Sequence, residues 1–143
     1  MAASYSVRPL SQSEAAAGAR VWNDLADGTL SSELAARIQT LLREAGTHDF
    51  AAFVAETRGE MCGIATARVI RDPLSGKRGE IEALMIDSRL PDEAGDALAH
   101  LAIDWLRERD VGSISHVRDA DAPGGAFWER LGFRRDKVLY TLL

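Results

Sequence analysis

Apolar residues recur at helical spacing in three long stretches of the chain, and shorter apolar runs bounded by turn residues lie between them. Ser11 and Glu14 have the spacing of a capping box at the start of the first helix, and Ser31 or Ser32 can cap the second. The predicted long helices run from Ser11 to about Ala26, from the Ser31–Ser32 pair to Gly46, and from about Pro91 to Arg109.

The shorter apolar runs predict strands. RGE and DPLSGK, which separate three consecutive runs, are turn sequences that suit antiparallel neighbours. A short helix, stopped by Gly132, follows a loop rich in Asp, Pro and Gly. The predicted strands span residues 4–10, 50–57, 62–71, 80–86, 113–117 and 138–143, and the short helix spans 123–131. The order β-α-α-β-β-β-α-β-α-β over residues 1–143 predicts a single α/β (α+β) domain, with a mixed, mostly antiparallel central sheet and helices available for both faces.

Composition narrows the class of protein. The 143 residues are 46% hydrophobic and 27% charged, which is typical of one globular domain with a substantial core. No apolar run reaches the roughly 18 residues of a membrane helix and no secretory signal is recognised, so a cytoplasmic protein is expected. The single cysteine, Cys62, leaves no internal disulfide and no CxxC metal motif. A net charge of −5 argues against nucleic acid and favours a cationic substrate such as an amine.

Three segments resemble the GNAT superfamily of acyl-CoA-dependent N-acetyltransferases. GEIEALMID (79–87) resembles the family's central fourth strand, GDALAHLAIDWL (95–106) its long coenzyme-A helix, and AFWERLGF (126–133) its late helix with a glycine–phenylalanine exit. The predicted element order is similar to that of the same family over nearly the whole chain. The resemblance implies an enzyme that uses acetyl-CoA as co-substrate and acetylates a primary amine of a small molecule or peptide by direct attack.

The resemblance also implies where the cofactor and the catalytic groups lie. Backbone groups near Met85 and Ile86 would bind the pantetheine arm, and the helix start at Gly95 would bind the pyrophosphate, with Arg89 close enough to reach it. Asp121 falls where the family often has an asparagine near the cofactor. A carboxylate would take a proton from the substrate ammonium, and a tyrosine on the late helix would protonate the departing thiolate.

Two parts of the implied site depart from the family pattern. Trp128 stands at the cofactor surface where the thiolate-protonating tyrosine is common, and because an indole N–H cannot take over that role, packing is the preferred interpretation. Tyr140 on the last predicted strand is a weak substitute. In the phosphate loop, Leu90 and Glu93 replace the basic residue and the first glycine, and Asp92 adds a second negative charge. Either this helix start binds a diphosphate, or its own carboxylates close it to anions.

Glu82 is the preferred candidate for the base, with Glu80 as second choice. Side chains alternate along a strand, so both carboxylates point to one face of the fourth predicted strand. If the DPLSGK turn pairs Arg71 with Arg78, Glu80 lies within reach of Arg71. Glu82 then faces only Ala67 and has room for a water. A plain structural role for Glu82 is the alternative.

Two classes of function stay open at this point. One is the N-acetyltransferase; the other is a binding or regulatory module that keeps the fold without binding acetyl-CoA, which the altered phosphate loop and Trp128 favour. In either case the apolar C-terminal strand VLYTLL could pair across a two-fold axis and form a homodimer. His100 and His116 have no Asp or Cys partner at a recognisable spacing and are interpreted as ordinary residues.

Overall fold

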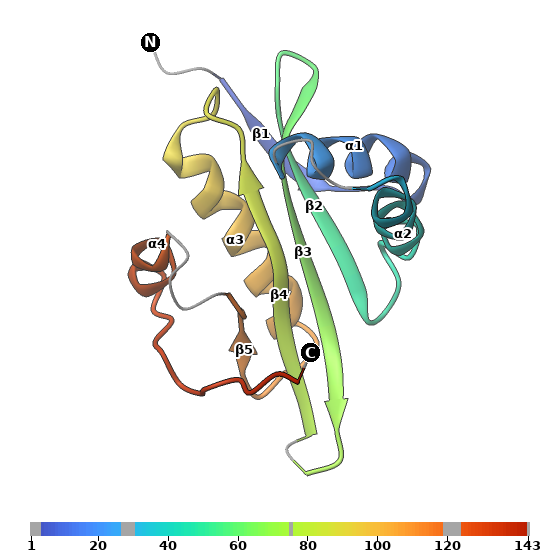
Figure 1. Cartoon of the computed structure of the whole chain (residues 1–143). Helices are drawn as coiled ribbons and strands as arrows, with labels where there is room; N and C mark the ends of the chain where they lie inside the picture. The colour runs from blue at the N-terminus through green and yellow to red at the C-terminus, as the bar shows by residue number, and fades with distance from the viewer. Residues whose placement is uncertain (1–3, 27–30, 75, 119–123, 143) are drawn as a thin grey trace.

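The computed structural model describes residues 4–26, 31–74, 76–118 and 124–142. These residues include a five-stranded sheet in the order β1-β2-β3-β4-β5 (Figure 1). β1 to β4 pair antiparallel in succession, and β5 runs parallel to β4. The mixed, mostly antiparallel sheet that the sequence predicts is therefore confirmed. The strands are β1 Ser6–Pro9, β2 Phe50–Thr57, β3 Glu60–Asp72, β4 Gly76–Ile86 and β5 Ile114–Ser115.

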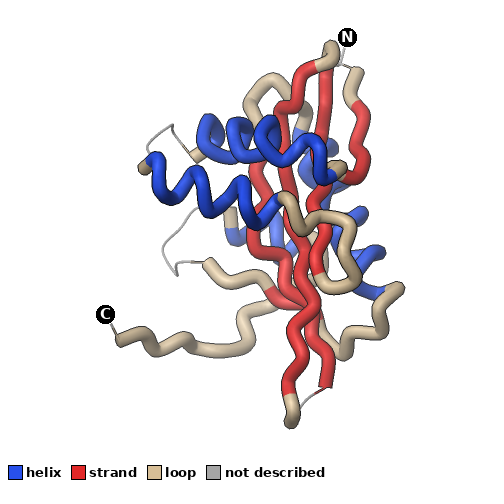
Figure 2. Tube along the Cα trace, turned by 90° about the vertical axis from the view of Figure 1, so that its right-hand side faces the viewer, coloured by secondary structure: helices blue, strands red, loops and turns tan. Residues whose placement is uncertain are grey.

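Helices cover both faces of this sheet, with α1 and α2 on one face and α3 on the other (Figure 2). A 3₁₀ turn at Gln12–Glu14 precedes α1, and there the Ser11 N–H donates to Glu14 Oε1 at 3.1 Å within the predicted capping box. The Ser31 hydroxyl caps α2 by accepting from the Leu34 N–H at 3.1 Å. No helix among the described residues is both long enough and apolar enough to cross a membrane. The helices are α1 Ala15–Leu25, α2 Ser32–Leu42, α3 Asp92–Arg107 and α4 Gly125–Arg130.

The core has two halves, one on each face of the sheet. On the α3 side, the fully buried Ile81 of β4 belongs to the same cluster as Leu106. On the α1–α2 side, Val54 of β2 belongs to the same cluster as Leu42. Burial of such side chains is the main favourable term in folding. The α3 side is tightly packed, since a Cβ added at Gly79 would lie 2.9 Å from Leu106 side-chain atoms.

The pairing of β3 with β4 differs from the prediction by one residue near the turn. Arg71 lies opposite Lys77 rather than Arg78, and its side chain pairs with Asp49 at 3.1 Å. A β-bulge at residues 65–67 shifts the register by one, so the pairs beyond it return to the predicted alignment. The expected contact between Arg71 and Glu80 was therefore wrong.

A buried hydroxyl stabilises this bulge. Thr66 is fully buried, and its Oγ1 accepts the Ala83 N–H at 3.1 Å, so the backbone group that loses its ladder partner stays satisfied. Between the pairs that flank the bulge, β4 has one more residue than β3, so the alternation of its side chains between the two faces of the sheet is interrupted. Ile81 and Leu84 both pack on the α3 side although three positions separate them.

The predicted strand at 138–143 was wrong for the residues of it that the structure describes. Residues 134–142 have no regular secondary structure, and the segment runs away from the sheet after α4 (Figure 2). Its apolar side chains are exposed, 78% for Val138, 72% for Leu139 and 99% for Leu142. The neighbouring edge strand, β5, is only two residues long, so it offers a short template for a further strand.

Candidate active site

β4 and β5 separate after a short parallel pairing. Gly79 pairs with Ile114 and Glu80 with Ser115, and among the described residues the pairing goes no further. β4 continues beyond this point, so residues 82–86 have an edge, on the side away from β3, that no described strand covers. We call residues 82–86 the open edge of β4.

Along the open edge, the backbone N–H and C=O groups of successive residues point alternately toward β3 and away from it. The Asp87 N–H donates to the Cys62 carbonyl on β3 at 2.7 Å, and the Met85 carbonyl lies 3.2 Å from where a Cβ on Gly63 of β3 would stand. Because successive residues point to opposite sides of a strand, the N–H and C=O of Ile86 point away from β3. The structure thus turns the Ile86 backbone toward the open edge, and directs the Met85 backbone into the pairing with β3.

α3 begins at Asp92, with Pro91 as the preceding residue, and no side chain caps its first turn. Asp92 and Glu93 are exposed, so their carboxylates lie in solvent while the first N–H groups of the helix keep no side-chain acceptor. Leu90, at the family's basic position, is a core residue with 5% of its surface exposed. The helix start is acidic, but its own carboxylates do not cap it.

Arg89 is the cation nearest in sequence to this helix start. Its Nε donates to Asp87 Oδ1 at 3.0 Å and its Nη1 donates to Glu60 Oε2 at 2.9 Å. The hydrogen bond from Arg89 lowers the pKa of Asp87 below its usual range. The Arg89 side chain is nevertheless 56% exposed, and a guanidinium has five donors, so two carboxylate partners leave donors for an anion.

Gly95 lies in the first turn of α3 but is buried, because it faces neighbouring elements rather than solvent. A Cβ at Gly95 would lie 3.5 Å from the Phe127 ring of α4 and 3.6 Å from the Ile86 side chain. The next residue, Asp96, pairs with Arg130 of α4 at 2.9 Å. This part of α3 therefore packs against α4, and the structure gives Gly95 a close-packing position.

Both candidate bases have an arginine partner. Arg68 Nε donates to Glu82 Oε1 at 2.5 Å, and Arg78 Nη1 donates to Glu80 Oε2 at 3.4 Å. The expectation that Glu82 faces only a small neighbour was wrong, because the one-residue difference in register puts Arg68 opposite Glu80 and within reach of Glu82. The Glu82 side chain remains 30% exposed, and its Oε2 has no hydrogen-bond donor among the described residues.

Trp128 is a packing residue, as the sequence predicts. It is 7% exposed, and the rings of Phe127 and Phe133 meet it edge-on with centroids 5.3 and 5.1 Å away. Tyr140 is 91% exposed and belongs to no strand, so the expected position on a last strand was wrong. Asp121 lies outside the described residues.

Sequence reasoning missed the environment of His116. Its ring stacks on Trp128 with centroids 3.9 Å apart and planes 16° from parallel. Its Nδ1 lies 2.8 Å from the Ile81 carbonyl oxygen, which can only accept, so Nδ1 carries the proton. Burial lowers the pKa of the half-buried imidazole. Both partners are distant in sequence, so no motif spacing signals this arrangement.

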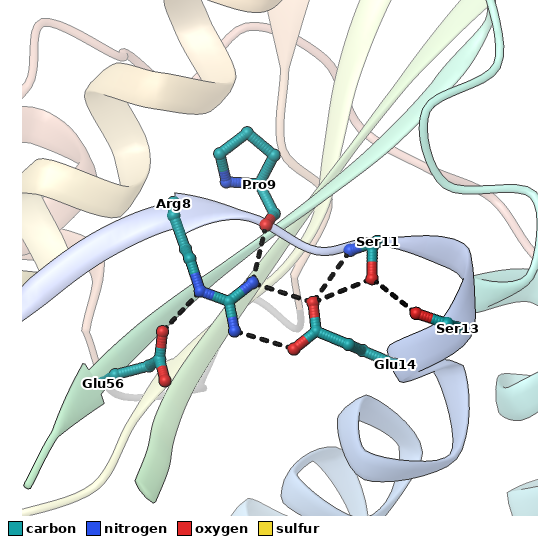
Figure 3. Close-up of polar contacts among 6 residues, drawn as sticks. All are labelled: Arg8, Pro9, Ser11, Ser13, Glu14 and Glu56. Atoms are coloured by element: carbon teal, nitrogen blue, oxygen red, sulfur yellow. Dashed lines mark hydrogen bonds and ion pairs between the residues drawn. The ribbon is translucent and has the colours of Figure 1, made fainter. Parts of the chain in front are cut away.

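A second polar cluster lies where β1 and β2 meet the start of α1 (Figure 3). Arg8 donates to both oxygens of Glu14, at 2.8 and 2.7 Å, and its Nε donates to Glu56. The hydrogen bonds from Arg8, together with that from the Ser11 backbone, lower the pKa of Glu14 to about 2. A groove of about 590 Å³ adjoins this cluster between α1 and the β2–β3 turn, and none of its lining residues belongs to the open edge of β4.

The chain belongs to the acetyltransferase (GNAT) family. The family's sequence model matches residues 19–133, a span that includes the open edge of β4, the start of α3 and all of α4. No curated protein sequence matches the chain.

Several solved structures with similar folds are N-acetyltransferases. A ribosomal-protein-alanine N-acetyltransferase from Brucella melitensis biovar Abortus 2308 has a TM-score of 0.75 and 15% identity, over 98% of this chain and 99% of that chain. Glucosamine-6-phosphate N-acetyltransferase from Arabidopsis thaliana has a TM-score of 0.76 and 19% identity, over 98% of each chain. The aminoglycoside N-acetyltransferase AAC(6')-Iy, solved in complex with CoA, has a TM-score of 0.81 and 14% identity, over 100% of this chain and 97% of that chain. At these identities the likeness shows the fold.

Proposed function

We propose that this chain is an acyl-CoA-dependent N-acetyltransferase, which transfers an acetyl group from acetyl-CoA to a primary amine of a small molecule or peptide. The observation that carries the proposal is the open edge of β4 beside the uncapped start of α3, in a chain of the GNAT family. Free backbone groups on a strand edge suit an extended ligand that contains amides, and helix N–H groups suit its diphosphate. The net charge of −5 supports a cationic amine as acceptor.

The residues at the start of α3 fit a diphosphate. The first-turn N–H groups have no side-chain cap, and Arg89 is exposed beside them. Asp92 and Glu93 are exposed and can turn toward solvent, and the charge of Asp96 is compensated by Arg130. Bound acetyl-CoA would supply the activated acetyl thioester. The Arg89 guanidinium would hold a phosphate with the N–H donors that its two carboxylate partners leave free.

Glu82 is the proposed base, and Glu80 is the second choice. The ion pair with Arg68 holds Glu82 Oε1, whereas Oε2 has no donor among the described side chains and the residue is partly exposed. Oε2 is thus available to take a proton from the substrate ammonium, directly or through a water. Loss of that proton gives the free amine whose lone pair attacks the thioester carbonyl.

The alternative is a binding or regulatory module of the same fold. The observation that favours it is the engagement of Arg89 by Asp87 and Glu60, together with two carboxylates in the first turn of α3. An anion must compete with these groups. A diphosphate that cannot do so would leave the chain without its acyl donor.

A thermal-shift titration with acetyl-CoA, and with free coenzyme A alongside, separates the two functions. A ligand at 100 times its dissociation constant adds about 2.7 kcal/mol to the free energy of unfolding, which is several degrees for a domain of this size. We expect a saturable shift that Arg89→Ala weakens and that Arg37→Ala, an exposed arginine on α2, does not change.

Release of free thiol from acetyl-CoA, measured with a panel of primary amines, then tests the transfer itself. Amine-dependent release is the expected result. A shift without release would indicate a coenzyme-A-binding module, and no shift up to millimolar ligand would overturn the proposal in favour of a module that does not bind the coenzyme.

The C-terminal segment supports a further part of the proposal, that two copies of the chain associate through it. Val138, Leu139 and Leu142 are exposed along one extended segment, and such apolar runs in water favour association. Light scattering after size exclusion should give a dimer for the full chain and a monomer for Leu139→Lys. A monomeric full chain would overturn this part and leave the proposed enzymatic function untouched.

A further inference from the structure

His116 stands where β4 and β5 stop pairing. Ser115 is the last residue of β5 in register with β4, and His116 is the next residue along the chain. The Ile81 carbonyl on β4 accepts a hydrogen bond from the imidazole Nδ1 of His116, at 2.8 Å, rather than from a backbone N–H of β5. The ring therefore lies at the inner end of the open edge, directly before residue 82.

Two contacts fix the orientation of this ring. One face is covered by Trp128, at 3.9 Å between centroids, and one edge is held by the bond from Nδ1 to Ile81. Because Nδ1 carries the proton, the neutral ring offers Nε2 as an acceptor. Nothing in the described part of the chain donates to Nε2. The imidazole is thus held in one tautomer with its second nitrogen available.

We propose that His116 is a catalytic residue that carries a proton from the attacking amine to the departing sulfur. This role rests on the proposed function, which places the acetyl thioester at the open edge of β4. The amine lone pair forms the C–N bond, and an N–H proton of the resulting adduct passes to His116 Nε2. As the C–S bond breaks, its electron pair goes to sulfur, and the proton passes from Nε2 to that sulfur. His116 ends neutral, with its Nδ1–H still on Ile81.

The proposal accounts for a function that Trp128 cannot perform. Its indole N–H has no useful acidity, so the proton for the leaving thiolate must come from another group. Among the residues in contact with Trp128, Phe127 and Phe133 carry no proton to give, whereas His116 does. Glu82 keeps a separate part of the reaction, since it takes the first ammonium proton before attack and releases it to solvent.

The charges around His116 set the pH range in which the ring is neutral. Burial is the main cause of its lowered pKa, the bond to the Ile81 carbonyl opposes it, Arg118 lowers the pKa further and Glu80 of β4 raises it. On α4, Arg130 is already paired with Asp96. The net effect is a pKa below the ordinary value of 6.5, so the imidazole stays neutral to a lower pH and its Nε2 can accept a proton there. Acidification protonates Nε2 and stops the transfer.

The pH dependence of kcat/KM in His116→Gln tests this role, with His100→Gln as the matched control. His100 is an exposed histidine on α3 whose Nδ1 also contacts a backbone carbonyl, that of Asp96, at 2.7 Å. We expect His116→Gln to lower kcat by about 100-fold or more, the usual contribution of acid–base catalysis, and to lose the acidic limb with a pKa below 6.5. His100→Gln should behave like the unmodified chain.

The nature of the leaving group distinguishes a catalytic role from a structural one. With p-nitrophenyl acetate as acyl donor, the departing phenolate needs no proton, so the defect of His116→Gln should be clearly smaller than with acetyl-CoA, although His116 still accepts the proton of the attacking amine. An equal defect with acetyl-CoA and with p-nitrophenyl acetate would overturn the proposal. If the variant does not fold, the unmodified chain decides, because a kcat/KM profile without that acidic limb would also overturn it.

Failure of the proposed function is a different result. If the unmodified chain releases no thiol with any amine, the proposed function and this role both fall. If the unmodified chain turns over and His116→Gln turns over at the same rate, only the role of His116 falls.

Discussion

Arg8 and Glu14 form a two-pronged ion pair that ties β1 to the start of α1, with Nη1 to Oε1 at 2.8 Å and Nη2 to Oε2 at 2.7 Å (Figure 3). The same carboxylate accepts the Ser11 N–H at 3.1 Å. Glu14 therefore caps the 3₁₀ turn before α1 and binds a strand at once. Paired N–H···O bonds of this kind are stronger and more specific in geometry than single ones.

Glu14→Gln should lower the free energy of unfolding and remove part of its acid sensitivity. The pKa of Glu14 is about 2 in the folded chain against an ordinary 4.5. The unfolded state therefore takes up the proton first, and the stabilisation, complete above pH 4.5, is lost as the pH falls toward about 2. Urea unfolding at a series of pH values should show a shallower decline for Glu14→Gln in that window.

The matched control for this prediction is Glu33→Gln on α2. Glu33 also pairs with an arginine, but its side chain is 76% exposed, so the change should be small. If Glu14→Gln and the unmodified chain lose stability in parallel between pH 4.5 and 2, the ion pair does not have the assigned effect.

Gly79→Ala should destabilise the fold by about 1–3 kcal/mol, the usual cost of an extra methyl in a close-packed core. The new Cβ would lie 2.9 Å from both Cδ atoms of Leu106 and 3.2 Å from its Cγ, so α3 must shift away from β4. Gly112→Ala is the control, because its Cβ would meet only the Lys77 carbonyl at 3.7 Å. Equal thermal midpoints for the two variants would contradict this account.

The paired change Asp92→Asn and Glu93→Gln should tighten the binding of coenzyme A. Each removed charge at a helix N-terminus is worth about 0.3–1 kcal/mol toward an anion, or about 2- to 5-fold in Kd. The gain should shrink as salt screens the charges. Glu108→Gln, at the other end of α3, should change nothing, because that side chain is 76% exposed and a full helix away. Isothermal titration at two salt concentrations measures all three chains.

Glu82→Gln should lower turnover strongly while moving the thermal midpoint little. The pair with Arg68 is partly exposed, and such pairs contribute about 1 kcal/mol or less to stability. Glu80→Gln on the same face of β4 is the control, and it should keep most of the activity. Full activity in Glu82→Gln would remove that residue from the proposed mechanism, and loss in Glu80→Gln alone would transfer the role to Glu80.

Elements with strong local signals could be predicted from the sequence, and contacts between elements could not. The capping box of Ser11 and Glu14 and the Ser31 cap are short-range patterns, and both form. The register of β3 against β4 depends on a bulge at residues 65–67 that a buried Thr66 hydroxyl satisfies, and no turn sequence encodes it. The apolar 138–142 segment has the pattern of a strand, but a pattern cannot say whether a sheet edge is available to pair with it.

The candidate site shows the same limit. The packing position of Trp128 followed from the chemistry of its side chain, which excludes acid catalysis. The partners of Glu82 and Arg89 did not follow, because each depends on a neighbouring strand or turn. His116 has no sequence signal at all, since its position is defined by where two parallel strands separate and by a ring from a later helix.

The stack of His116 on Trp128 also gives the molecule an internal optical reporter. An imidazolium in contact with an indole quenches its fluorescence far more than a neutral imidazole does. The other two tryptophans have different surroundings, since Trp105 lies under the Arg109 guanidinium at 3.7 Å and Trp22 packs against the core cluster on the α1–α2 side. The tryptophan emission of the folded chain should therefore fall as His116 gains a proton, which makes the state of this ring visible without substrate, label or mutation.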